Sequence, residues 1–360
     1  MKRAAVLLLL ATACSSGTAK HNPVATPSVP STPSATVTAL ATGAPPSPSP
    51  TAVALDGPVG TTVPQGFHPS SATFISDRTG WVLGASPCPS GAGDCDVIAR
   101  TRDGGATWRA IPSPATSPDH LAQIRFADPR NGFVTGDQLW ATHDGGATWK
   151  VVPGSNDVTA LAAAAGRVWV LRESALRSAP VAGGAFRAEQ GEAFGGFALR
   201  GATVVFHPDG RQRALVTVTP GTSGRELDDP CSEGDSSIIG LGMSHWLLVC
   251  EGDAGLGHQG KKAYRSEDRG HTWQPSGDPP PLTGTDIYVT SDGDFVIDHQ
   301  EVAVYRGGMW KVALGSDGGL SEGGFESAVL GFAIGGFDGS AGAVMKITHD
   351  AGRTWRTVAF

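Results

Sequence analysis

The chain has 360 residues, of which 40% are hydrophobic, 17% charged and 7% aromatic, and its formal net charge is −7. Gly occurs 50 times and Pro 26 times, but without a Gly-X-Y period, which excludes a collagen-like chain. The nine Trp and 13 Phe call for a folded core and argue against a wholly disordered chain, and no Lys/Arg cluster indicates a nucleic-acid partner.

Residues 1–13 are typical of an export signal peptide. Lys2 and Arg3 form a basic start, and the apolar run that follows is too short to span a bilayer as a mature helix. The small residues that precede Cys14 resemble the lipobox of bacterial lipoproteins, although Ala11 stands where that motif usually has Leu. The resemblance implies cleavage before Cys14 and a lipid on its sulfur, which would anchor the chain at the outer face of the cytoplasmic membrane, in the bacterial cell envelope. The alternative is an ordinary secretory signal with an incidental Cys.

Residues 14–66 are predicted to be a lipidated, disordered tether. From residue 15 this segment contains ten Pro, no aromatic residue and only two charged residues, Lys20 and Asp56. Such a composition cannot bury enough apolar surface to offset the loss of chain entropy on folding. We expect an extended spacer that holds the rest of the chain away from a membrane.

A repeat begins at residue 67. The pattern Ser/Thr-x-Asp-x-Gly-x-Thr-Trp occurs four times without gaps, and its Asp residues are 41, 124 and 82 residues apart, close to one, three and two times 41. This spacing predicts degenerate repeats near residues 185, 227 and 309, and therefore seven repeats over 67–360. The four matches are Thr101–Trp108, Thr142–Trp149, Ser266–Trp273 and Thr348–Trp355.

Short apolar runs rich in β-branched residues precede each match and are separated by Gly, Asp or Asn turns, as in 72–83 and 286–297. Together with one run that enters the motif and one that leaves it, they give four strands per repeat. A period of about 40 residues with four strands is typical of a propeller blade. We therefore predict an all-β fold, a seven-bladed β-propeller over 67–360, preceded by the tether.

Each residue type in the repeated motif has a structural reason. Asp at the start of a turn accepts hydrogen bonds from backbone N–H groups, Gly two residues later can adopt a positive φ, and Trp can pack between neighbouring sheets. The motif resembles the Asp-box, or bacterial neuraminidase (BNR, sialidase-like) repeat, in which these turns lie at the periphery of the blades. The resemblance implies a folding role for Asp103, Gly105, Trp108, Asp144, Gly146, Trp149, Asp268, Gly270, Trp273, Asp350, Gly352 and Trp355.

A second resemblance rests on these repeats together with strands of the form Gly-Trp/Phe-Val-x-Gly, as at 80–84 and 132–136. The combination is similar to the photosystem II assembly factor family of propellers and covers 67–360. The resemblance implies a scaffold that binds a protein, although the basic central patch that helps binding in that family has no equivalent run here.

Four cysteines remain after Cys14. Cys88 and Cys95 bracket a hairpin insertion, and Cys231 and Cys250 flank an acidic loop and a strand. An even number in an exported chain favours two disulfides, with 88–95 and 231–250 as the local pairing, although the other pairings remain open. The absence of a C-x-x-C spacing argues against a metal site built from cysteine.

An enzyme of the sialidase type would need an arginine cluster, a Tyr with a Glu partner, and an acid/base Asp. The Phe/Tyr-Arg-Ile-Pro signature is absent, although Arg125 lies on an expected inner strand. Tyr264 and Tyr305 are expected at the periphery, so Tyr288 is the one tyrosine expected near the centre. Other glycoside hydrolases use a pair of carboxylates that spacing alone cannot locate across blades.

Two acidic patches offer the oxygen ligands that Ca²⁺ prefers, but solvated loop charge is the simpler interpretation of both. The sequence therefore assigns no catalytic residue, no metal ligand and no cofactor. It favours a membrane-anchored extracytoplasmic propeller that acts as a binding or scaffold module for an envelope protein or glycan, with a sialidase-like glycoside hydrolase or lyase acting on extracellular glycans as the alternative. The two patches are Asp292, Asp294, Asp298 and His299, and Asp228, Asp229, Glu233 and Asp235.

Overall fold

The structure is a computed structural model, and it describes residues 57–360 apart from several short gaps. The signal sequence, Cys14 and most of the predicted tether therefore lie outside the described residues. None of the described segments is a helix long and apolar enough to cross a membrane. The gaps are 92, 115–121, 193–196, 201–202, 207–214, 219–223, 233–234, 256–257, 282–285, 292, 338 and 341.

The described strands form seven four-stranded antiparallel sheets, each built from four successive strands. Sheets 1 to 4 consist of β1 (His68–Phe74), β2 (Gly80–Pro87), β3 (Asp94–Thr101) and β4 (Arg109–Ile111); β5 (Ile124–Phe126), β6 (Gly132–Val134), β7 (Gln138–Thr142) and β8 (Lys150–Asn156); β9 (Val158–Ala164), β10 (Arg167–Arg172), β11 (Ala175–Pro180) and β12 (Arg187–Glu192); and β13 (Phe197–Arg200), β14 (Thr203–Phe206), β15 (Leu215–Val218) and β16 (Arg225–Leu227). Sheets 5 to 7 consist of β17 (Ser236–Leu241), β18 (Trp246–Gly255), β19 (His258–Ser266) and β20 (Gln274–Pro275); β21 (Asp286–Val289), β22 (Asp294–Ile297), β23 (Glu301–Arg306) and β24 (Met309–Gly315); and β25 (Leu320–Phe325), β26 (Gly331–Gly335), β27 (Val344–Thr348) and β28 (Arg356–Thr357).

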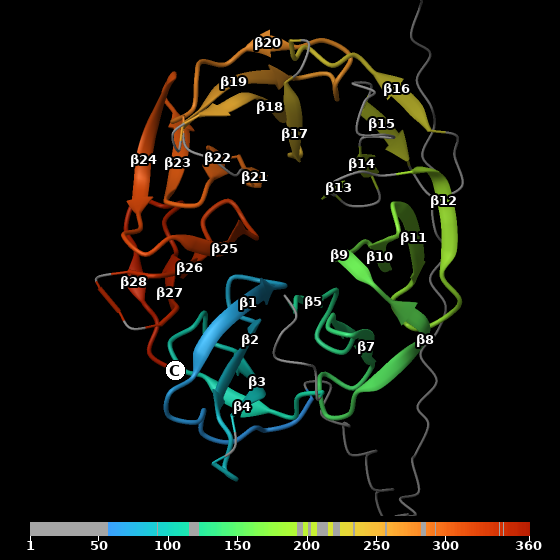
Figure 1. Cartoon of the computed structure of the whole chain (residues 1–360), viewed down its shortest axis with the longest axis vertical. Coiled ribbons are helices and arrows are strands. Elements are labelled where there is room, and N and C mark those ends of the chain that lie inside the picture. The colour runs from blue at the N-terminus through green and yellow to red at the C-terminus, as the bar shows by residue number, and fades with distance from the viewer. Residues whose placement is uncertain are drawn as a thin grey trace, which may run out of the picture. The chain divides into compact units, whose positions relative to one another are not determined.

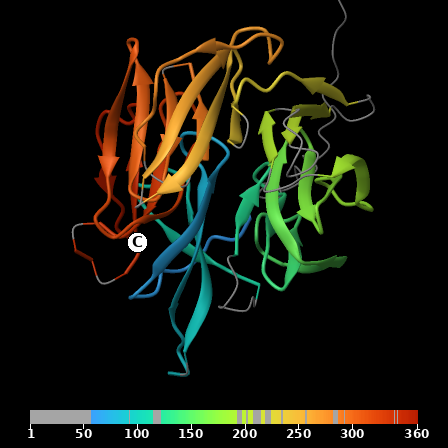
Figure 2. The same ribbon diagram turned by 45° about the horizontal axis from the view of Figure 1, so that its top comes forward.

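The sheets stand around a common centre, with the first strand of each sheet innermost and the fourth at the rim (Figure 1). Each first strand contacts the first strand of the next sheet, and β1 contacts β25, which closes the ring. Figure 2 shows the sheets inclined around the centre and the β2–β3 hairpin projecting beyond them. This arrangement confirms the predicted all-β propeller.

The prediction of seven blades built on Asp-box repeats is corrected to six full blades, because the described part of sheet 4 lacks the longer strands that each of the other six sheets contains. Among the described residues, six sheets contain at least one strand of five or more residues, whereas sheet 4, whose strands border the gaps at 193–196, 201–202, 207–214 and 219–223, contains none. The sequence around sheet 4 offers a physical reason. It has only short apolar runs between turn residues, whereas sheets 3 and 6, which also lack a match to the motif, have longer ones.

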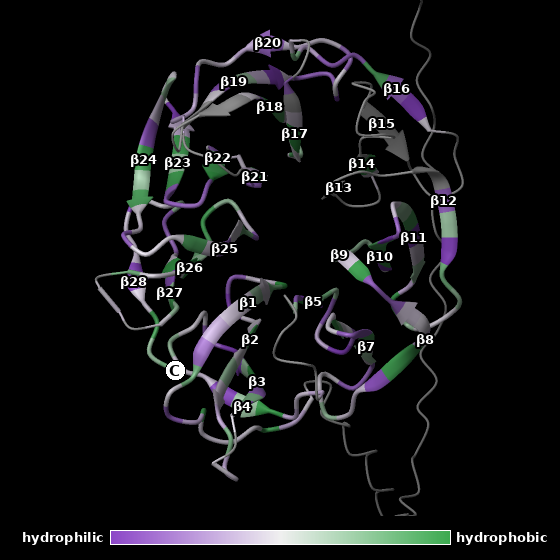
Figure 3. Cartoon of the chain, in the orientation of Figure 1, coloured by the Kyte–Doolittle hydropathy of each residue, from purple (hydrophilic) through white to green (hydrophobic). Residues whose placement is uncertain are grey.

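The core lies between neighbouring sheets as a series of apolar layers, and Figure 3 shows hydrophobic residues also on the rim strands β8 and β24. Two layers contain stacked aromatic pairs. The rings of Trp81 and Phe126 are 3.7 Å apart between sheets 1 and 2, and those of Phe295 and Phe325 are 3.6 Å apart between sheets 6 and 7. Burial of such large side chains removes a large apolar area from water at these two interfaces.

A Phe–Gly–Trp cluster recurs within three sheets. A Phe at the end of the first strand faces a Gly at the start of the second, and a Cβ on that Gly would lie within 2.5 Å of the Phe ring. The Trp of the repeated motif packs edge-on against the same Phe. Glycine is therefore required by the close approach of the ring. The clusters are Phe74, Gly80 and Trp108; Phe126, Gly132 and Trp149; and Phe325, Gly331 and Trp355.

The described end of the predicted tether lies along the rim of sheet 1. Thr61 forms an antiparallel bridge with Ala110, with N–H···O distances of 2.8 and 2.9 Å, and the Arg100 guanidinium donates to the carbonyl oxygen of Pro58. Contact with the propeller thus begins before residue 67.

Candidate functional site at the centre of the ring

The four repeated motifs form the same turn between the third and fourth strands of their sheets. These turns therefore lie on the rim side of each sheet, two strands away from the inner strand. In sheet 2, Asp144 Oδ1 accepts hydrogen bonds from the Thr142 hydroxyl (2.8 Å) and the Thr148 N–H (2.9 Å), and Oδ2 accepts one from the Thr148 hydroxyl (2.6 Å). Gly146 has a φ of 88°, and its N–H donates to the Thr142 hydroxyl. The other turns share this pattern at Asp103, Asp268 and Asp350.

These hydrogen bonds change the acidity of the turn carboxylates. Partial desolvation acts to raise the pKa of Asp103, but hydrogen bonds from Thr107 and Thr101 outweigh it and lower the pKa to about 2. The pKa of Asp268 is also lowered to about 2, first by the backbone N–H of Thr272. The carboxylates are thus ionised and their oxygens are used within their own turns.

An indole N–H near the start of the fourth strand connects neighbouring sheets at three places. Each donates to a backbone carbonyl directly after the fourth strand of the preceding sheet, so the tryptophan contributes a directional bond as well as packing. The pairs are Trp149 with Pro112 (2.9 Å), Trp273 with Asp228 (2.8 Å) and Trp310 with Ser276 (3.2 Å).

The four cysteines form two disulfides, Cys88–Cys95 and Cys231–Cys250, which is the local pairing favoured by the sequence. The first closes the β2–β3 hairpin. The second joins the segment after β16 to β18, and therefore links sheets 4 and 5. Asp229 lies beside it, and its carboxylate accepts hydrogen bonds from the Cys231 N–H and from a serine hydroxyl.

The structure does not bring the other acidic patch together. Asp294 and Asp298 lie at opposite ends of β22, and Asp292 is outside the described residues. Asp294 accepts a 2.5 Å hydrogen bond from buried His245, whereas Asp298 lies 3.8 Å from the buried ammonium of Lys261. Each carboxylate therefore links sheet 6 to sheet 5, which fits a structural role better than a shared cation site.

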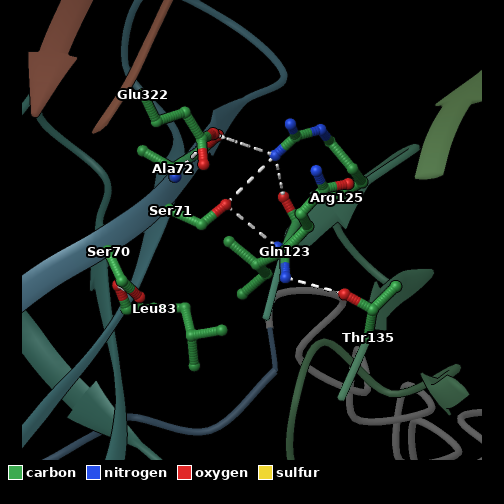
Figure 4. A network of polar contacts seen from close by, with 9 residues as sticks. Ser70, Ser71, Ala72, Leu83, Gln123, Arg125, Thr135 and Glu322 are labelled. Carbon is green, nitrogen blue, oxygen red and sulfur yellow. Dashed lines mark hydrogen bonds and ion pairs between the residues drawn. The ribbon is translucent and has the colours of Figure 1, made fainter. Parts of the chain in front are cut away.

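The inner strands of four sheets bring polar side chains together near the centre of the ring. Arg125 on β5 lies 3.2 Å from Glu322 on β25 and also donates to the hydroxyl of Ser71 on β1 (3.2 Å) and to the carbonyl of Ile124 (2.7 Å). Figure 4 shows the guanidinium held between these groups, with Glu322 also accepting from the Ala72 N–H. The arginine is therefore fixed by partners from three sheets.

Two further titratable groups on β21 belong to this cluster. Desolvation, reinforced by the negative charge of Glu322, raises the pKa of Asp286, although its side chain is open to solvent. Desolvation and the charge of Asp286 raise the pKa of Tyr288 well above its usual value. Burial acts to lower the pKa of Arg125, but the charge of Glu322, together with smaller contributions from Tyr288 and Glu326, outweighs it and raises that pKa. The cluster thus holds a permanent cation, two acids and a neutral phenol.

The sequence placed the three tyrosines correctly but missed the acids around Tyr288. Tyr288 is on an inner strand, whereas Tyr264 and Tyr305 are on the third strands of their sheets. Glu322 and Asp286 could not be connected with Arg125 from spacing, because they come from other sheets. The one available signal was that Arg125 and Asp286 lie in runs expected to be inner strands, whereas Glu322 precedes the run expected for its repeat.

The comparisons with known proteins identify the fold. No protein-family model matches the chain, and no curated protein matches its sequence. Among solved structures, YCF48 bound to D1 peptide is 16% identical with a TM-score of 0.54, covering 80% of this chain and 95% of that one. YCF48 from Cyanidioschyzon merolae is also 16% identical, with a TM-score of 0.53, and the match covers 80% of this chain and 97% of that one. The β-propeller domain of the Trilobed protease from Pyrococcus furiosus is 7% identical, with a TM-score of 0.58, and the match covers 83% of this chain and 97% of that one. At these identities the likeness concerns the β-propeller fold.

Proposed function

We propose that this chain is a membrane-anchored extracytoplasmic propeller that acts as a binding or scaffold module for an envelope protein or glycan. Cleavage before Cys14 and lipidation of its sulfur would hold it at the membrane, and residues 14–66 would serve as the spacer. The two disulfides support an oxidising compartment, because such bonds are rare in the cytoplasm.

The arginine at the ring centre is the main support for binding rather than hydrolysis. A sialidase would need several arginines free to hold a substrate carboxylate, but the guanidinium of Arg125 is already paired with Glu322. A raised pKa also keeps the Tyr288 hydroxyl neutral, which opposes its use as a nucleophile. The likeness to a propeller whose structure was solved with a bound peptide supports the same choice.

We assign the four turn aspartates, with their glycines and tryptophans, to folding. Their carboxylate oxygens accept hydrogen bonds from their own turns, and the tryptophans pack on core phenylalanines in three sheets. These residues lie at the third-to-fourth strand turns, away from the inner strands that would meet a partner at the centre.

Photocrosslinking from the full chain in cells tests the proposed binding. A photoreactive residue at Asp286, which is exposed on an inner strand, should give one dominant adduct, whereas the same residue at Lys311, exposed on the rim strand β24, should not. Equal adducts from both positions would contradict a binding face at the centre. Hydrolysis of envelope glycans by the purified chain, abolished by Asp286→Asn, would instead establish the hydrolase.

Metabolic labelling tests the proposed anchor. The wild-type chain should incorporate a fatty-acid label and fractionate with membranes, and the Cys14→Ser variant should do neither. Labelling that survives this substitution would show that the anchor is elsewhere.

A further inference from the structure

A pocket of about 480 Å³ opens between sheets 2 and 3, outside the cluster at the ring centre. Its walls come from β7, β8, β9 and β10 and from the turn that leads to β12, the green part of Figure 1. The volume lies within the range of small-molecule sites, about 300–1,000 Å³. Its apolar wall consists of Leu139, Val152, Val158, Val170 and Phe186.

Two arginines on one face of the β10–β11 hairpin complete the pocket. In the register of these strands Arg172 faces Ala175 and Val170 faces Arg177, and residues paired or two apart along a strand share a face. Both guanidiniums therefore stand on the side of the hairpin that carries Val170 toward sheet 2. The pair follows from strand register, which is why spacing in the sequence did not indicate it.

The charges of these arginines are only weakly compensated by the described residues. Arg172 donates to the carbonyl of Gly154, and its nearest acid is exposed Glu173 at 3.9 Å. Arg177 forms no ion pair with any described side chain, and the Nε of each arginine is buried without a hydrogen bond to a described group. The residues that line the pocket include no Asp or Glu. The site is thus locally cationic in a chain whose net charge is −7.

We propose that this pocket binds a carboxylate that carries a short apolar group. The planar guanidinium presents paired N–H donors that match the two oxygens of a carboxylate. The apolar wall would cover the aliphatic or aromatic part of the same ligand. A free carboxylic acid and the C-terminal residue of a peptide share this chemistry. The proposal does not depend on the cluster at the ring centre.

Calorimetric titration of the full chain with four probes tests the pocket and separates the sources of the carboxylate. The probes are hexanoate, a short peptide that ends in Leu with a free carboxylate, the same peptide with an amidated end, and inorganic phosphate. We expect at least one of the two carboxylates to bind, and binding of the peptide to be lost on amidation. A site for free acids takes hexanoate alone, and a site for chain ends takes the peptide. Binding of neither carboxylate, or binding of phosphate as tightly as the better one, would overturn the proposal.

Variants locate the binding. Arg177→Gln should weaken it at least tenfold, whereas Arg187→Gln, an exposed arginine of the same sheet outside the pocket, should leave it unchanged. Ala185→Phe adds bulk to the lining without altering charge and should also weaken binding. Unchanged melting temperatures would show that each variant is folded, and Ala185→Phe provides an independent reading if Arg177→Gln is not. Equal affinity in Arg177→Gln, Ala185→Phe and wild type would place the bound carboxylate elsewhere.

Discussion

Replacing Gly132 with Ala should destabilise the propeller although it adds a single methyl group. The added Cβ would lie 2.4, 2.5 and 2.6 Å from three atoms of the Phe126 ring, where ordinary contacts are well over 3 Å. The ring cannot move away easily, because Trp81 stacks on it at 3.7 Å and Trp149 meets it edge-on at 6.1 Å. Phe126 itself is only 3% exposed.

The size of the effect follows from two opposing contributions. Overpacking of a filled core costs about 1–3 kcal/mol, and the enclosed ring places this substitution in the upper half of that range. Replacing Gly by Ala also reduces the entropy of the unfolded chain, which stabilises by about 0.4–1 kcal/mol where the backbone is compatible. The net expectation is a loss of about 1–2.6 kcal/mol in the free energy of unfolding.

Urea unfolding of the full chain measures this loss against a matched glycine. A Cβ at Gly315 in β24 would meet nothing within 4 Å, so Gly315→Ala should be neutral or slightly stabilising. Leucine at position 126 lacks the ring atoms that clash, so Gly132→Ala should cost little in a Phe126→Leu background. If Gly132→Ala matches Gly315→Ala, or if its cost is the same in both backgrounds, the contact with Phe126 does not explain the glycine.

Three further predictions concern the turns, the disulfides and the central cluster. Because the pKa of Asp103 is lowered to about 2, the stabilisation by its carboxylate is present above about pH 4 and is lost as the pH falls toward 2. The difference in melting temperature between wild type and Asp103→Asn should therefore narrow between about pH 4 and about pH 2. A difference that stays constant with pH would contradict this. Replacing both Cys231 and Cys250 with Ser removes a crosslink that spans 19 residues and should lower the free energy of unfolding, measured by thermal unfolding, by about 3 kcal/mol. Loss of the Cys88–Cys95 crosslink, which spans 7 residues, should cost less, because a shorter loop restricts the unfolded chain less. The reverse order would refute this reasoning. Glu322→Gln leaves Arg125 without its carboxylate and should cost about 1–2 kcal/mol by the same measurement, whereas an unchanged melting temperature would mean that the pair is not coupled.

Local features of the chain could be predicted from the sequence because their partners are close along it. The turns at Asp103 and Asp144 use residues within four positions, and Cys88 pairs with a cysteine seven residues away. A fixed period then implies stacked sheets, since each repeat must bury its faces against neighbours. The short described strands of sheet 4 could not be predicted, because the period marks where a repeat falls and not how long its strands are.

The candidate sites were much less predictable for the opposite reason. Arg125 and Glu322 are 197 residues apart and meet only because the ring closes. Arg172 and Arg177 are close in sequence, but the face they share depends on the register of the β10–β11 hairpin. A cation and an acid in separate repeats carry no signal of their pairing in a single sequence.

Ring closure has a consequence for how the chain could be cut and rejoined. Every sheet of the described residues is complete within one stretch of sequence, so none of these sheets combines strands from the two ends of residues 57–360. The two ends of the ring also meet, since the rings of Phe67 and Phe360 are 4.7 Å apart. A short linker could therefore join these ends while new termini are opened between any two sheets. The linker between sheets 7 and 1 would then be equivalent to the connections between the other sheets. Circular permutants of the propeller should therefore retain the whole fold.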